Sequence, residues 1–389
     1  MFLYNIWKFI YGRKTKKMKL KMLVALVLAA GIATMSFAKS HFITPGARAG
    51  GYGTAFSAIA DDLTAIYYNP AGLAYQKDTQ VMASLFYIDY PATASDKIMS
   101  NYGSDKYQTN AIVPFLAFST KFYYDTTIAA GIYVLGGGGG KVIDPIKPYV
   151  EKIEGQQSYM VYNISLAKQI TEKFSVGLGF DAIQFQDKLV AKIPAYGIDV
   201  DYNRSAFGFQ GNIGFMYKPI EKFSTAFVLR SGSYVDVPNE KDSSNPAFRE
   251  NVCYPLTWEF GFAYDLFEDF TFAAAISENK TSWTSVRYHD IFQYRVGTEY
   301  RATEKLALHL GFFSDPNLIK DEYRDTYSLT NLDMYNMKYL TIGAEYKFTD
   351  ALKAGLSLTH SFTNPVTYEG VTYKYEINLG RFDISYKFL

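Results

Sequence analysis

Apolar and polar residues alternate along much of this sequence, and the alternation limits the possible folds more than any other feature. Residues 174–181, 257–264 and 340–348 show it most clearly, with large apolar side chains at every second position and small or polar ones between. A period of two residues places successive side chains on opposite faces of a strand. The chain beyond about residue 80 is therefore predicted to form strands with one apolar and one polar face.

Counting such segments gives about 14 strands, each near the roughly 9–11 residues that a tilted membrane-spanning strand requires. The expected strands are 81–90, 111–119, 126–135, 157–168, 174–187, 204–217, 223–235, 256–265, 270–280, 290–301, 306–314, 338–348, 352–363 and 373–388. The expected fold class is all-β.

The connections between these segments alternate in length. Those after even-numbered strands are short, as in 168–173 and 301–305, whereas those after odd-numbered strands are mostly long, as in 91–110 and 315–337. Outer-membrane barrels have short periplasmic turns and longer outer loops, and a soluble sandwich has no reason to keep its long loops on one edge. The pattern predicts a transmembrane antiparallel β-barrel over residues 81–389.

Composition and charge fit this prediction. The chain holds 34 Tyr and 30 Phe, which suits a surface at a membrane interface, and its net charge of +1 gives no indication of nucleic-acid binding. Charged strand residues fall on the polar parity, which predicts a wet lumen of mixed charge; they are Asp181, Glu259, Arg295, Glu299, Arg301, His309, Glu345 and Lys347.

The first 38 residues have the features of a secretory signal peptide. Lysines between Lys14 and Lys21 precede an apolar run over 22–35, and Ser36-Phe37-Ala38 supplies small residues for cleavage after Ala38. Met18 is an alternative start to Met1, and an N-terminal membrane anchor is the alternative to a cleaved peptide. Export is expected to end in the outer membrane.

Two glycine-containing stretches carry local expectations. The run Gly136–Gly140 lacks the ending of a phosphate loop and is expected to be a flexible outer loop. In the last strand the apolar residues change parity, from Ile377 and Leu379 to Phe382, so a bulge or bend is expected near Gly380 and Arg381. Glycines within other strands are candidates for kinks or a lateral opening.

Residues 39–80 are rich in glycine and contain Ala60-Asp61-Asp62 followed by Asn69-Pro70-Ala71-Gly72. Glycines permit close packing, and the Asn-Pro step fixes a turn. A compact segment of this kind ahead of a barrel is expected to be an N-terminal plug that fills the lumen.

This order of a glycine-rich arm, Ala-Asp-Asp and Asn-Pro-Ala-Gly resembles the N-terminal hatch of the FadL/TodX family of outer-membrane hydrophobic-compound transporters, and also that of the related PorV-like branch. The FadL resemblance implies a 14-strand barrel closed by the hatch. It also implies that apolar ligands adsorb at outer loops and leave through a gap in the wall. It places gating at Asn69, Pro70, Ala71 and Gly72. The alternative is that these residues only fix the fold of the plug.

Other candidate sites are few. Arg295 and Arg301 are hypothesised to bind a ligand carboxylate, with pairing to Glu299 and Glu345 as the alternative. The four histidines lack metal-ligand spacing, so no metal or cofactor is expected, and no Ser–His site has an orienting third group. The lone Cys253 is assigned no role. An enzyme is therefore not expected.

The leading hypothesis is passive uptake of hydrophobic small molecules, with long-chain fatty acids as candidates, by a barrel that contacts outer-membrane lipids and the barrel-assembly machinery. The alternative is a PorV-like accessory protein for secretion or surface attachment of proteins.

Overall fold

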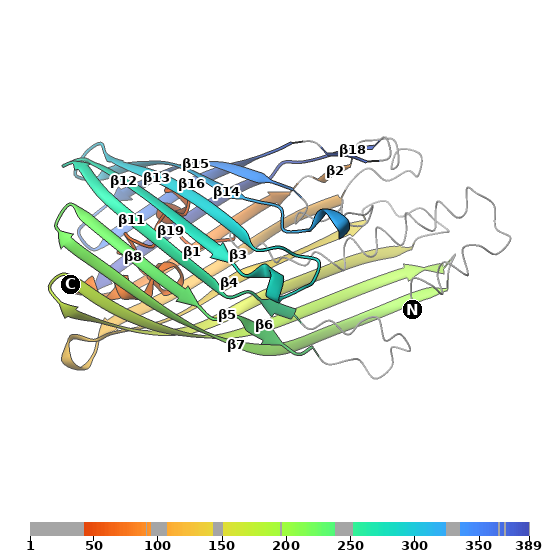
Figure 1. The fold of residues 1–389 in the computed structure, drawn as a ribbon, viewed down its shortest axis with the longest axis horizontal. Coiled ribbons are helices and arrows are strands. Elements are labelled where there is room, and N and C mark those ends of the chain that lie inside the picture. The colour runs from red at the N-terminus through yellow and green to blue at the C-terminus, as the bar shows by residue number, and fades with distance from the viewer. Residues whose placement is uncertain are drawn as a thin grey trace.

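The computed structural model describes residues 43–90, 92–94, 107–142, 151–194, 197–237, 252–323, 335–364, 366–368 and 371–388. The expected signal peptide lies outside these residues. Fourteen described strands close into one antiparallel barrel in the order β1-β19-β16-β15-β14-β13-β12-β11-β8-β7-β6-β5-β4-β3, as predicted (Figure 1). The strands are β1 (Thr79–Tyr90), β3 (Tyr107–Lys121), β4 (Thr127–Val142), β5 (Lys152–Thr171), β6 (Phe174–Ile193), β7 (Ile198–Ile220), β8 (Phe223–Arg230), β11 (Thr257–Phe267), β12 (Phe270–Asn279), β13 (Ile291–Arg301), β14 (Leu306–Asp315), β15 (Met337–Lys347), β16 (Leu352–Thr363) and β19 (Asn378–Phe388).

Smaller elements lie outside the ring. Short strands form a pair, β9 (Ser233–Val235) with β10 (Val252–Tyr254), and a three-stranded sheet of β2 (Ala92–Ala94), β17 (Val366–Tyr368) and β18 (Val371–Tyr375). Single 3₁₀ turns are η4 (Tyr123–Asp125), η7 (Thr281–Trp283) and η8 (Asp321–Tyr323). Among the described residues no helix is long and apolar enough to cross a membrane.

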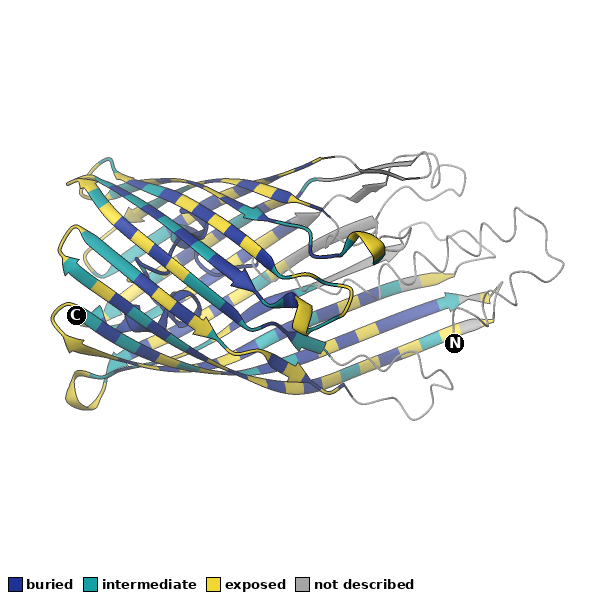
Figure 2. Ribbon diagram, in the orientation of Figure 1, coloured by how far each residue is buried: buried dark blue, intermediate teal, exposed yellow. Residues whose placement is uncertain are grey.

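The alternation expected from the sequence is present along the strands, which carry buried and exposed residues in turn (Figure 2). On β6 the side chains of Leu178 and Phe180 are exposed on the outer face, whereas that of Asp181 is fully buried inside the barrel. Arg295 and His309 are also buried. The lipid-facing part of the barrel is therefore apolar outside, and Asp181, Arg295 and His309 lie on the inner face.

Several strands are longer than predicted, β5, β6 and β7 among them. β5, β6 and β7 extend beyond their neighbours at the end of the barrel with long loops (Figure 1), where the sequence had indicated a loop over 188–203. On β6 the outer face changes from Phe180 to Gln184 and Lys188, so the apolar alternation ends while the backbone pairing continues. Hydrophobic periodicity marks only the part of a strand that faces lipid.

The glycine run 136–140 is not the flexible loop that was expected. It continues β4 and pairs with β5, from Gly136 opposite Tyr159 to Gly140 opposite Gly155, with a register shift after Val134. Glycine is disfavoured in strands because it has no side chain to pack, which is why the run gave no strand signal.

The bulge expected near Gly380 and Arg381 is also absent. β19 pairs in continuous register with both β1 and β16. Ile377 and Leu379 are buried on the same inner face as Arg381. The apparent change of parity arises because the lumen is itself apolar at this height.

Candidate functional site

The segment 43–78, called here the hatch, lies inside the barrel near the end with the short turns (Figure 1). It contains α3 (Ala47–Gly51), α4 (Ala65–Tyr68) and η2 (Pro70–Tyr75), and most of its side chains are buried. Just before α4, Asp62 Oδ1 accepts a hydrogen bond from Thr64 N at 2.8 Å. Burial raises the pKa of the Asp62 carboxyl, and the neighbouring Asp61 adds to the effect.

The Asn-Pro-Ala-Gly motif forms the start of η2. Asn69 Oδ1 accepts a hydrogen bond from Ala71 N at 3.0 Å and so caps the first turn. Its Nδ2 donates to Ser57 O at 2.9 Å within the hatch and to Phe215 O of β7 at 3.2 Å. One side chain therefore fixes the turn, joins two parts of the hatch and ties the hatch to the wall.

Wall glycines make room for this motif. A Cβ atom at Gly177 of β6 would lie 2.2 Å from Pro70 C, and one at Gly214 of β7 would lie 2.0 Å from Asn69 Oδ1. At Gly177 the backbone of the motif therefore packs directly on the strand backbone, and at Gly214 the side chains of Asn69 and Pro70 do so. Ser175 Oγ, beside Gly177, donates to Ala71 O at 2.9 Å. Asn69, Pro70 and Ala71 are thus held against β6 and β7, whereas Gly72 packs on the backbone of Ala60 within the hatch.

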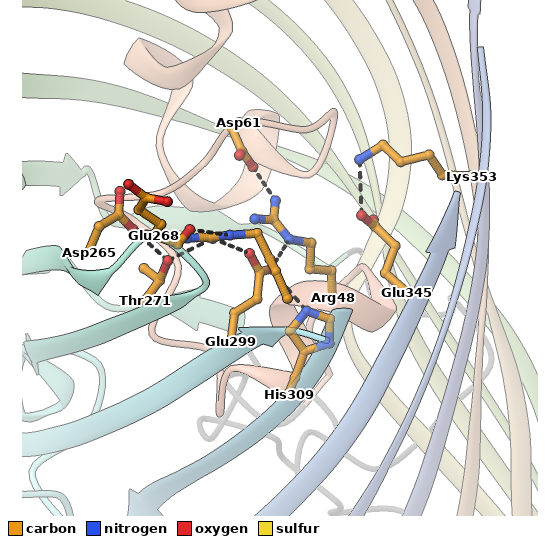
Figure 3. Close-up of polar contacts among 10 residues, drawn as sticks. Arg48, Asp61, Asp265, Glu268, Thr271, Glu299, His309, Glu345 and Lys353 are labelled. Carbon is orange, nitrogen blue, oxygen red and sulfur yellow. Dashed lines mark hydrogen bonds and ion pairs between the residues drawn. The ribbon is translucent and has the colours of Figure 1, made fainter. Parts of the chain in front are cut away.

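The opposite side of the hatch is held by charge (Figure 3). Arg48 of α3 pairs with Asp61 of the hatch and, through Nε, with Glu299 Oε2 of β13 at 2.9 Å. The same carboxylate contacts His309 Nε2 at 3.1 Å, and its Oε1 accepts from Arg301 Nη1 at 3.0 Å. Glu299 thus joins one cation of the hatch to two basic groups of the wall.

Other wall charges are paired differently from the sequence hypothesis. Arg301 does pair with Glu299, but Glu345 contacts Lys353 Nζ at 3.1 Å. Arg295 contacts Glu259 Oε2 at 2.8 Å and also donates to Ser277 and Gln293. Arg301 lies at the rim of the short-turn end, where its Nη2 donates to Glu268 O at 2.8 Å.

Two anchors in the last strand were missed by sequence reasoning. Arg381 Nε donates to Thr44 O at 3.1 Å, and Asp383 Oδ2 accepts from Ala47 N at 2.6 Å. Strand β19 therefore binds the N-terminal end of α3 and the residues before it. Both residues alternate with apolar neighbours in the sequence, and this parity was the available signal.

Arg295 also lines a small polar cavity between the hatch and β8, β11 and β13, together with Arg230, Glu259, Tyr67 and Thr54. Thr54 has a φ of 63°, a conformation that is strained for a β-branched residue. Among the described residues, Thr54 Oγ1, Glu259 Oε1 and Arg230 Nε have no hydrogen-bond partner. Two guanidinium groups face one carboxylate, so the cavity carries net positive charge.

Beyond the hatch, towards the long loops, the inner face carries clusters of aromatic side chains. Tyr159 packs on Phe185 with ring centroids 4.9 Å apart, and on Tyr254 at 5.2 Å. On the opposite wall Phe313 stacks on Tyr339 at 4.3 Å. The lumen is therefore charged and hydrogen-bonded beside the hatch and lined by these aromatic rings beyond it, with buried polar pairs such as Arg204–Asp187 and Gln293–Asp315 farther out.

The wall itself is interrupted between two strands. β3 and β4 pair from Leu116 opposite Ile132 down to the short turn, and again at Gln108 opposite Lys141, but residues 109–115 and 133–140 form no ladder with each other. β3 contains Pro114 here, which lacks a backbone N–H. The β1–β3 ladder is continuous through the same region, so the irregularity is confined to one seam.

Comparison with known proteins gives a family with this architecture. A family described as "Outer membrane protein transport protein (OMPP1/FadL/TodX)" matches residues 29–254, more than half of the chain. The chain belongs to the FadL/TodX family. No curated protein sequence matches it. The short-turn end, which the hatch occupies, is by analogy with such barrels the periplasmic end.

Solved structures with this fold share little sequence with this FadL/TodX member. A FadL homologue from Pseudomonas aeruginosa has a TM-score of 0.67 at 13% identity, over 89% of this chain and 99% of that one. The toluene transporter TbuX of Ralstonia pickettii has 0.64 at 14%, over 90% and 100%. The toluene transporter TodX of P. putida has 0.61 at 15%, over 84% and 94%. At such identities the likeness shows the fold alone.

Family membership supports transport of hydrophobic compounds by an outer-membrane barrel, and the family is one of channels rather than enzymes. Among the described residues no three His, Cys, Asp or Glu side chains are grouped as a metal site would require.

Proposed function

We propose that this protein takes up hydrophobic small molecules passively, receiving them in the apolar outer part of the lumen and releasing them sideways through the β3–β4 seam. The observation that carries the proposal is the division of the lumen, which is apolar around Tyr159 and Phe185 and closed by a charged hatch beneath. An apolar ligand gains free energy from leaving water, at roughly 25 cal/mol per Å² of buried apolar surface. It would lose free energy by displacing ion pairs in the hatch.

The height of the seam supports a sideways path. In β5, Tyr162 opposite Ile132 is exposed and apolar, whereas Gln156 opposite Gly139 is exposed and polar. On β3 itself Ile112 is exposed and apolar within the unpaired stretch, so this stretch lies in the upper part of the apolar band and continues above it. Unpaired backbone groups are costly in hydrocarbon but not where water reaches them. A ligand leaving here would enter the outer leaflet near its interface.

The contacts of the Asn-Pro-Ala-Gly motif support a fixed hatch rather than a moving gate. Asn69 makes three hydrogen bonds, and its neighbours pack on glycine backbone at Gly177 and Gly214. We propose that Asn69, Pro70, Ala71 and Gly72 keep the periplasmic end closed while ligands leave through the wall.

The polar cavity beside the hatch is the proposed contact for a carboxylate at the end of an otherwise apolar ligand, such as a long-chain fatty acid. Arg230 is the better donor, because its Nε is unpartnered, whereas Arg295 already donates to three wall residues. Arg301 has its donors engaged at the rim, which favours a role in fixing the wall.

Uptake of [¹⁴C]oleate and [¹⁴C]toluene tests the function in cells that lack other family members, with and without this protein. Uptake of at least one compound several-fold above the empty vector supports the proposal, and equal uptake of both contradicts it. Secretion or attachment of surface proteins that depends on the chain, without any uptake, would support the PorV-like role instead.

The carboxylate contact is tested separately with purified protein in detergent. Arg230→Gln and Arg295→Ala are expected to weaken binding of labelled oleate at least tenfold and to leave toluene uptake within twofold. Unchanged oleate binding by both variants would remove fatty acids as the proposed ligand class while leaving hydrocarbon uptake standing.

A further inference from the structure

One aromatic side chain closes the inner side of the β3–β4 seam. Tyr133 is the first residue of β4 beyond the last pair with β3, and its side chain is 1% exposed inside the barrel. Its ring lies 6.5 Å from that of Phe115, the first unpaired residue of β3 on the opposite side of the seam. The two rings therefore stand where a ligand would pass from the lumen to the wall.

Tyr133 is held from two further directions. Its ring meets Tyr67 of α4 edge-on, with centroids 5.6 Å apart. Its hydroxyl donates to Asp181 Oδ1 of β6 at 3.1 Å. The hatch thus supports the ring, and a carboxylate two strands away in the wall fixes the direction of the side chain.

Asp181 is arranged to hold this hydroxyl. It is fully buried, and besides Tyr133 it accepts hydrogen bonds from Asn163 Nδ2 at 2.6 Å and from Asn212 Nδ2 at 3.3 Å. The two amides fix the carboxylate, and an ionised acceptor makes a stronger hydrogen bond than a neutral one. A carboxylate in this position is costly to bury, so its presence calls for a role beyond filling space.

We propose that Tyr133 is the residue that controls passage from the lumen to the β3–β4 seam, and that Asp181 is the positioning residue that keeps it closed. This inference rests on the proposed function, because it assigns the control of the sideways path. In the closed position the ring of Tyr133 lies between Phe115 of β3 and Tyr67 of the hatch, and so covers the inner side of the seam. Passage requires the hydroxyl to leave Asp181 so that the ring can turn away from Phe115.

The test compares initial rates of [¹⁴C]toluene and [¹⁴C]oleate uptake at equal amounts of folded barrel, judged by migration on unheated gels. Tyr133→Ala is expected to raise the rate of the compound that the wild type transports at least threefold, because the seam loses its cover. Phe260→Ala removes a ring from the outer face of β11, away from the seam and from the lumen, where the ladders are unbroken, and should change the rate less than twofold. A purely structural role would reduce the amount of folded barrel and leave the rate per folded barrel unchanged.

A double-mutant cycle tests the role of Asp181. Tyr133→Phe and Asp181→Ala should each raise the rate, and the double variant should be no faster than the faster single variant, because both remove one hydrogen bond. Asp181→Asn retains an acceptor oxygen and should stay within twofold of the wild type. If Asp181→Ala does not assemble, Tyr133→Phe alone carries the test, since it removes only the hydroxyl.

Three outcomes would overturn the inference. An unchanged or slower rate for Tyr133→Ala removes Tyr133 as the controlling residue. Multiplicative effects in the double variant remove Asp181 as its positioning residue. Wild-type uptake no faster than the empty vector overturns the proposed function and this inference together, whereas normal wild-type uptake with an unaffected Tyr133→Ala overturns the inference alone.

Discussion

Glu299→Ala is expected to loosen the hatch without unfolding the barrel. Glu299 is the wall partner of Arg48, with Nε and Oε2 2.9 Å apart and with side-chain exposures of 11% for Arg48 and 6% for Glu299. His309 and Arg301 lie on the wall whether the hatch is docked or not, so only the Arg48 contact bears on docking. Removing one partner of a buried ion pair costs about 3–5 kcal/mol.

The lower end of this range applies because Arg48 keeps its second partner, Asp61, within the hatch. A loss of about 3 kcal/mol corresponds to roughly a 100-fold larger population of the undocked hatch, since about 1.4 kcal/mol is a factor of ten. The free energy of unfolding of the barrel should change much less, because the hydrogen bonds between its strands are made by backbone groups and not by the Glu299 side chain.

Maleimide labelling measures the undocked population. Ser57→Cys places a near-isosteric thiol in the hatch at a position that is 1% exposed, in a chain whose native Cys253 is replaced by Ser. Glu299→Ala should speed labelling about 100-fold. Glu345→Ala is the matched control, because its partner Lys353 is on the wall and both groups are partly exposed, so the rate should change less than fivefold. Equal labelling rates with and without Glu299 would refute the view that this ion pair docks the hatch.

Two further outcomes are expected from substitutions in the wall. Gly177→Val places side-chain atoms about where Pro70 now packs and should speed maleimide labelling of the same hatch thiol. Gly211→Val meets nothing within 4 Å and should leave the labelling rate unchanged. Slow labelling in both variants would show that the hatch stays docked when Pro70 is displaced. Leu178→Lys puts a charge in the lipid-facing band and should cost about 2–4 kcal/mol, read as a lower urea midpoint in phospholipid vesicles. Asn203→Lys lies above that band, on the outer face of β7 opposite Lys188, so its cost should be below about 1 kcal/mol. Equal costs for the two variants would show that the band extends to Asn203.

The sequence predicted the ring of strands well because lipid imposes a strict rule on every strand that crosses it. An outward charge near the middle of the membrane is costly, so residues such as Leu178 and Phe180 alternate with inward ones, and the pattern is readable without a structure. Strand residues beyond the lipid-facing band are not subject to this constraint, so they show no apolar alternation. Gln184 and Lys188 continue β6 with no apolar signal, and the glycine run 136–140 continues β4 with none either.

The hatch contacts were less predictable, for a physical reason. The motif Asn69–Gly72 was recognisable, but its partners are backbone atoms and the empty space at Gly177 and Gly214. These contacts join residues more than a hundred positions apart and leave no local periodicity. Buried anchors such as Arg381 were visible only as polar residues on an otherwise apolar parity.

The distribution of charge inside the barrel argues for one direction of travel. At the periplasmic end each buried cation meets an acceptor, as Arg48 meets Glu299 and Arg381 meets Thr44 O. An apolar ligand that moved through the hatch to the periplasmic end would separate such partners and form no hydrogen bonds with them. Each buried charge left without a partner would cost several kcal/mol. At the β3–β4 seam the same ligand would displace the aromatic rings of Tyr133 and Phe115, whose contacts are of the order of 1 kcal/mol each, and would break one hydrogen bond, from Tyr133 to Asp181, worth about 1.5–3 kcal/mol. The proposed sideways path therefore has the lower barrier, and in this proposal the hatch serves transport by remaining in place.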